Sequence, residues 1–144
     1  MATAIPRTER LEVIERARRD PCWWMRTFLG VDLWHKQREI AEALIKHRRV
    51  SVKSCNGAGK SYSAAALVAH FTGVWDEAFA LTTATKFSQV REVLWREIGN
   101  MIRRARVPLN VELLQTQMRW PHGSTAIGLT APENDVSKMQ GFRG

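Results

Sequence analysis

The chain has 144 residues, and its 22 basic and 14 acidic side chains give a formal net charge of +8 at neutral pH. The hydrophobic fraction of 44% is ordinary for a globular protein and allows one domain with a core. No apolar run approaches the length of a membrane span, and residues 1–20 are too charged for a signal peptide, so we expect no membrane partner. The basic balance fits an anionic partner such as a nucleic acid or a nucleotide, and fits a solvated basic surface equally well.

The chain is expected to open with a charged amphipathic helix over residues 8–19, which Asp20-Pro21 ends. Such a helix packs on its own domain more often than it docks a partner. The apolar segment 22–33 is expected to form a short helix and a turn. Trp23 and Trp24 favour core packing over stacking on a nucleic acid.

A second helix is expected over residues 34–47, with Gln37 near its start. The planar amide of a glutamine carries a donor and an acceptor, so it can pair with the N6 and N7 edge of adenine. An exposed glutamine at a helix start usually has no such role. The position of Gln37 upstream of a glycine-rich loop makes both readings equally good.

Residues 49–54 are expected to form the first core strand, followed by a small-residue loop and an alanine-rich helix that ends near Gly73. This is the order that a phosphate-binding loop needs. The usual pattern has a glycine where this chain has Ser54, but a relaxed form, small-x-x-Gly-x-Gly-Lys-Ser, fits residues 54–61 throughout. A glycine-rich turn before an ordinary helix is the competing interpretation.

Each part of this loop has a physical role in holding a polyphosphate. Gly57 and Gly59 allow sharp turns that bring backbone N–H groups close to the anion. Lys60 can reach the β- and γ-phosphates, and the Ser61 hydroxyl can ligate Mg²⁺. The residues expected to contact ATP are Gln37, Ser54, Cys55, Asn56, Gly57, Ala58, Gly59, Lys60, Ser61 and Tyr62. A disulfide at Cys55 would obstruct the loop, which indicates a reducing compartment.

Downstream, a second strand is expected over residues 78–83 and a long helix over residues 88–104. Asp76-Glu77 looks like a catalytic pair but falls between a helix and the next strand, so solvated loop charges explain it better. Residues 114–120 and 125–130 are expected to form a hairpin around a glycine-containing turn.

Taken in order, Gln37, the phosphate loop, the Thr83-Ala84-Thr85 strand end and the Gly-Phe-Arg-Gly stretch at 141–144 resemble the N-terminal ATPase region of the large terminase subunit of tailed bacteriophages. Members of that family are motors that package DNA into proheads. The resemblance covers the chain from about Asp20 onward. Each motif is shared with superfamily-2 helicases, and the order of all of them is more specific.

The resemblance implies an α/β fold, namely a RecA-like P-loop NTPase of the additional-strand class with a mostly parallel core sheet plus a β-hairpin. Residues 1–49 would be a helical lead-in that carries the adenine-side glutamine, and residues 50–144 a partial ATPase core. By resemblance, Gln37 contacts adenine, Lys60 holds phosphates and Ser61 holds Mg²⁺. Arg143 matches an arginine that acts in some members on the ATP of a neighbouring subunit, and a helix-end or DNA-facing arginine is an equal alternative.

The implied partners are double-stranded DNA, a portal protein, a small terminase subunit and further copies in a homo-oligomeric ring, all in the host cytoplasm. The implied cofactors are ATP and Mg²⁺, and the parent protein would also be an endonuclease. Two departures matter. Asn56 stands where some members carry an arginine, and the Walker B aspartate, the catalytic glutamate and the nuclease would all lie beyond Gly144. We therefore expect a truncated chain that is inactive alone as an ATPase.

Two other functions remain open from the sequence. A superfamily-2 helicase-like DNA translocase shares the adenine glutamine and the phosphate loop. A non-catalytic nucleotide- or DNA-binding module needs no residue that activates water. A small-molecule kinase fits less well, because such kinases usually carry the phosphate loop near the N-terminus.

Overall fold

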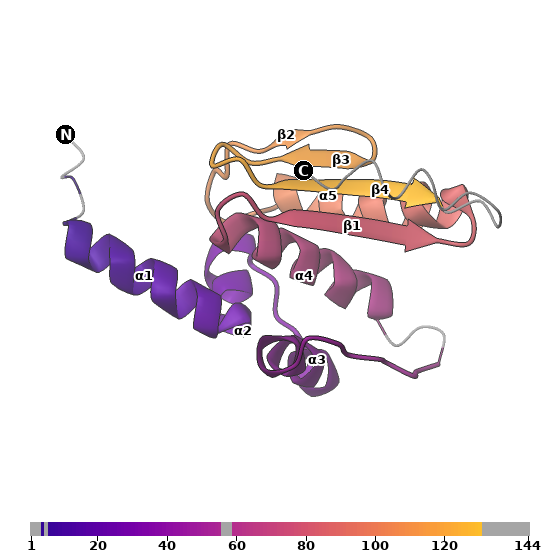
Figure 1. The fold of residues 1–144 in the computed structure, drawn as a ribbon, viewed down its shortest axis with the longest axis horizontal. Helices are drawn as coiled ribbons and strands as arrows, with labels where there is room; N and C mark the ends of the chain where they lie inside the picture. Colours follow the sequence, from indigo (N-terminus) through magenta and orange to yellow (C-terminus); the bar gives the residue numbers. More distant parts are fainter. Residues whose placement is uncertain (1–3, 5, 56–58, 131–144) are drawn as a thin grey trace.

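The computed structural model describes residue 4, residues 6–55 and residues 59–130. Helices form most of the N-terminal half, and the strands follow them (Figure 1). The helices are α1 (Arg7–Arg19), α2 (Pro21–Trp24), the π-helix η1 (Met25–Leu29), α3 (His35–Lys46), α4 (Lys60–Val74), the π-helix η2 (Gln89–Leu94) and α5 (Trp95–Arg103). The strands are β1 (Phe79–Ala84), β2 (Glu112–Leu113), β3 (Gln117–Arg119) and β4 (Thr125–Thr130).

The strands form a four-stranded mixed sheet in the order β1-β4-β3-β2. β1 is parallel to β4, with Phe79 opposite Thr125, whereas β3 is antiparallel to both β4 and β2. The expected α/β class is therefore confirmed. Of the expected mostly parallel core sheet plus a β-hairpin, the described residues show one parallel pair, β1 with β4, and the antiparallel hairpin of β3 and β4, to which β2 adds a second antiparallel pair.

The expected first core strand at 49–54 is absent, since residues 50–55 belong to no strand. Only Val50 and Val52 in this segment are apolar, and residues 51–55 are all exposed. The segment instead runs past Ile40 and Ala43 of α3, with which it shares a cavity. Two valines flanked by charged and hydroxylic side chains bury too little apolar surface to hold the segment in the sheet interior.

One face of the sheet is covered by η2, α5 and α4. Alternate side chains of a strand point to one face, and the buried Thr82 of β1 and Ala126 of β4 point toward the helices. The indole of Trp95 donates a 2.9 Å hydrogen bond to the Thr82 hydroxyl, which itself donates to the carbonyl of Ile127 at 3.1 Å. On the other face, Phe79 and Leu81 keep 42% and 38% of their surface exposed.

The predicted hairpin is confirmed, with β3 and β4 joined by a turn in which Gly123 has a φ of +93°. The hydroxyl of Ser124 fixes this turn to the rest of the sheet. It accepts a 3.0 Å hydrogen bond from the N–H of Ala78 and donates to the carbonyl of Trp75 at 2.5 Å. β2 was not predicted, since its two residues carry no alternation that a sequence can show.

The predicted N-terminal helices are confirmed within one or two residues. Asp20 accepts a 3.1 Å hydrogen bond from the N–H of Trp23 and so caps α2, in which Pro21 occupies the first turn. Trp24 is 5% exposed and packs in the core, as expected. The apolar core includes residues from both expected parts of the chain, such as Ala41 from residues 1–49 and Ala65 from residues 50–144. In the described parts of the chain, no helix has the length and apolar content needed to span a membrane.

Candidate phosphate-binding site

The start of α3 is joined to the start of α4 by one side chain, Gln37. Its Oε1 accepts a 3.1 Å hydrogen bond from the N–H of Trp34, the residue before α3. Its Nε2 donates a 3.0 Å hydrogen bond to the carbonyl of Gly59. Gln37 is only 6% exposed, so these bonds satisfy a buried amide that would otherwise cost stability. The structure thus places Gln37 against the C-terminal end of the predicted loop.

Gly59 precedes α4 in the left-handed conformation, with φ of +77° and ψ of +25°. A Cβ at this position would lie 2.5 Å from the amide nitrogen of Gln37, so a glycine is required both by the backbone angle and by the space. The N-terminus of α4 has no side-chain cap and no acidic residue in its first turn. Among the described residues, no side chain therefore caps the N–H groups at the start of this 15-residue helix, and the positive end of its dipole suits an anion.

Lys60 is the first residue of α4 and its side chain extends back toward the beginning of the loop. Its Nζ donates a 3.1 Å hydrogen bond to the carbonyl of Ser54. The lysine thereby connects the two ends of the loop, whose intermediate residues Asn56, Gly57 and Ala58 lie outside the described residues. A phosphate at the helix end could replace the Ser54 carbonyl as the acceptor for this exposed ammonium.

These groups share an open cavity of about 590 Å³ between α3, residues 50–55 and the start of α4. Its lining includes Gln37, Lys60, Ser54 and Cys55, so four of the predicted contact residues meet here. The cavity also includes Trp34, whose indole is 47% exposed. Trp34 was not among the residues predicted to contact a ligand. The signal available in the sequence was a tryptophan three positions before Gln37.

Other predicted contact residues lie apart from this cavity. Ser61 is half-buried in the first turn of α4 and is not part of the cavity wall. Tyr62 lines a different cavity of about 390 Å³, together with Gly30 and Glu97. Burial raises the pKa of the Tyr62 phenol, and the nearby charges of Glu97 and Asp32 raise it further. Arg143 lies outside the described residues.

One carboxylate, Glu39, lines the 590 Å³ cavity among the described residues, and it is paired with Lys36 at 3.2 Å. Across the residues that the structure describes, no cluster of histidine, cysteine, aspartate or glutamate has the geometry of a metal site. A magnesium ion here would depend on Ser61, bound phosphates and water, the set that Mg²⁺ often uses with nucleotides.

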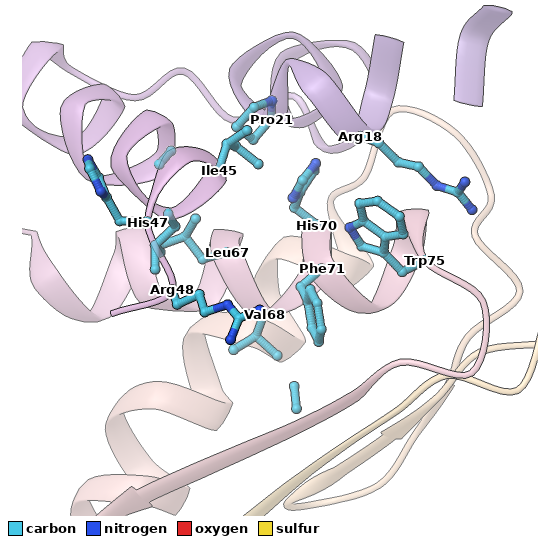
Figure 2. Close-up of a pocket in the computed structure, with 13 residues that line it drawn as sticks. Arg18, Pro21, Ile45, His47, Arg48, Leu67, Val68, His70, Phe71 and Trp75 are labelled. Atoms are coloured by element: carbon cyan, nitrogen blue, oxygen red, sulfur yellow. The ribbon is translucent and has the colours of Figure 1, made fainter. Parts of the chain in front are cut away.

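A second cavity, of about 490 Å³, opens between α3, α4 and the edge of β1 (Figure 2). Apolar side chains such as Ile45 and Phe71 form most of its wall. Arg18 extends over the Trp75 indole, with the guanidinium carbon 4.4 Å from the ring centroid, and donates a 2.8 Å hydrogen bond to the carbonyl of Val74. Among the described residues, the wall contains neither a carboxylate nor a hydroxyl group. Its two imidazoles are His47 and His70, and a ring nitrogen of His70 lies 2.7 Å from the carbonyl oxygen of Ala17, so the wall offers no group of three metal ligands.

Comparison with protein-family models found no family that matches this chain, and comparison with curated proteins found no significant match.

Proposed function

We propose that this chain is the ATP-binding part of a DNA-packaging motor of the large-terminase type, with a RecA-like P-loop fold in the complete protein. The observation that carries the proposal is the position of the Lys60 ammonium. It extends from an uncapped helix N-terminus toward Ser54, within the cavity that also contains Gln37. A nucleoside triphosphate site needs a cation and backbone N–H groups for the phosphates, and an amide that can pair with the base.

In this proposal each group has one task. Lys60 and the first-turn N–H groups of α4 bind and orient the phosphates, and the Ser61 hydroxyl contributes one oxygen to Mg²⁺, which neutralises phosphate charge when bound. Gln37 uses one N–H on Gly59 and one lone pair on Trp34. A primary amide has a second N–H and a second lone pair, and these suit the N6 and N7 edge of adenine.

The test is equilibrium binding of Mg-ATP and of inorganic tripolyphosphate to the full chain. Lys60→Ala is expected to weaken both at least about tenfold, because a hydrogen bond to a charged group contributes about 1.5–3 kcal/mol. Gln37→Ala should weaken ATP more than tripolyphosphate, because the amide would contact adenine in addition to holding Gly59. Lys46→Ala, at the exposed end of α3, removes the same charge away from the cavity and serves as the control.

Unchanged ATP affinity in Lys60→Ala would refute the proposal, since the loop would then be an ordinary turn before a helix. Loss of affinity in Lys46→Ala to the same extent would indicate that net charge alone attracts the nucleotide. Equal effects of Gln37→Ala on both ligands would remove the adenine role and keep the phosphate role.

A further inference from the structure

A groove of about 600 Å³ runs between the helices η2 and α5 and the residues that follow β2. Three arginines line it, namely Arg91, Arg96 and Arg103, and we call this feature the arginine groove. The other side is formed by Leu113, Leu114 and Gln115. It contains none of the residues that line the cavity at Lys60.

The cations of the arginine groove are largely uncompensated. Glu92 lines the groove as well, and it pairs with Arg91 at 3.2 Å. Within the described part of the chain, Arg96 makes no ion pair and Arg103 donates to a neutral group, the Asn100 side-chain oxygen, at 3.0 Å. Two guanidinium groups therefore face solvent without a carboxylate partner.

Gly99 contributes to the position of one of these cations. A Cβ at Gly99 would lie 3.1 Å from Nη1 of Arg103, so the absence of a side chain lets this guanidinium lie back along the helix over residue 99. Arg96 and Arg103 are seven residues apart, which is about two helical turns and places them on one face. The two groups thus point along the same groove.

The helix dipole does not account for this arrangement. A basic residue in the last turn of a helix stabilises that helix, and Arg103 occupies such a position in α5. Arg96 lies inside a continuous helix, because η2 runs directly into α5 and Leu94 between them has helical backbone angles. Neither end of the helix dipole therefore accounts for the charge of Arg96.

We propose that the arginine groove binds the phosphate backbone of duplex nucleic acid. The proposal rests on the DNA-translocating part of the proposed function. Arg91 and Arg103 are twelve residues apart, about 18 Å along the helix axis. Phosphates of one DNA strand follow each other every ~3.4 Å of axis, so this row spans about five of them. Guanidinium groups bind phosphate oxygens in a bidentate way, and a row of them suits a polymer better than one small anion.

The experiment measures binding of the full chain to a fluorescent 25-base-pair duplex of mixed sequence, from 50 to 200 mM KCl. The test variant is Arg96→Gln with Arg103→Gln. The control is Arg7→Gln with Arg26→Gln, which removes the same charge from exposed positions elsewhere. A third variant, Arg96→Lys with Arg103→Lys, keeps the charge. Thermal unfolding confirms that all variants are folded.

Each phosphate contact contributes about 0.9 to the slope of log affinity against log salt, which is about eightfold in affinity at 100 mM. The double glutamine variant is therefore expected to lose about 60-fold in affinity and about 1.8 in slope relative to wild type. The lysine variant should keep the slope, and the control should differ from wild type by less than about threefold.

Equal affinity and slope in the double glutamine variant and the control would overturn the inference while the DNA part of the proposed function survived. No duplex binding by the wild type at 50 mM KCl would overturn both the inference and the DNA part of the proposed function. The ATP experiment with Lys60→Ala would still test the ATP-binding part separately. Poly-glutamate binding that is lost in the double glutamine variant while duplex binding is kept would also overturn it, in favour of an acidic protein partner.

Discussion

Gln37 shows how one side chain can fix the end of a loop relative to a helix. Its amide joins the N–H of Trp34 to the carbonyl of Gly59, which are 25 positions apart in the chain. The Gly59 carbonyl also accepts a 3.0 Å hydrogen bond from the N–H of Ser63. Gln37 therefore fixes the last residue of the loop relative to α3, whereas the helix fixes it relative to α4.

Replacing Gln37 by alanine is expected to lower the free energy of unfolding by about 1–3 kcal/mol, because a buried side chain would lose both of its hydrogen bonds. Gln37→Glu should be at least as harmful, since its charge would lie against the Gly59 carbonyl. Urea unfolding measures both. Gln115→Ala, at an exposed position, should stay within about 0.5 kcal/mol of wild type. Wild-type stability in Gln37→Ala would show that the two hydrogen bonds of Gln37 contribute nothing to the free energy of unfolding.

At the scale of elements, the close approach of η2 and α5 to the sheet depends on Gly128. A Cβ built on this glycine would lie 2.6 Å from Cγ1 of Val90 and would overlap the Trp95 indole. The same indole donates the hydrogen bond to Thr82 that ties the helix to β1. β4 thus carries a glycine, Gly128, at the point where η2 and α5 pack against the sheet.

Gly128→Ala is expected to destabilise the fold by about 1–3 kcal/mol, as overpacking of a dense core does. Thr125→Ala in the same strand is half-buried and serves as the matched control, with a cost below about 1 kcal/mol. The measurement is urea unfolding followed by tryptophan fluorescence. The explanation fails if Gly128→Ala is as stable as Thr125→Ala.

The elements differ in how far the sequence could predict them. α1, α3, α4, β1 and the hairpin follow from apolar periodicity, capping residues and a glycine-containing turn, which are local signals. The position of residues 50–55 is not local, since it depends on what pairs with them across the sheet, and the expected strand did not form. Gln37 and Lys60 were predicted from motif order. Trp34 and the arginine groove emerge only when separate segments are brought together.

For the whole molecule, the proposed function assigns to the described residues the binding half of an ATPase site. Hydrolysis requires a base or a positioned polar group to direct water at the γ-phosphate. The carboxylate at the cavity, Glu39, is paired with Lys36. We therefore expect the 144-residue chain to bind Mg-ATP and to hydrolyse it no faster than buffer does.

A coupled phosphate-release assay at saturating Mg-ATP measures this, with Lys60→Ala and Glu39→Gln as parallel variants. The expected result is the same background rate in all three proteins. Turnover that disappears in both variants would identify Glu39 as the base and would contradict the expectation. Turnover that disappears only in Lys60→Ala would require a catalytic group from residues outside the described ranges or from a second copy. A rate proportional to the square of protein concentration would select the second copy, because a site shared between subunits is completed only on association.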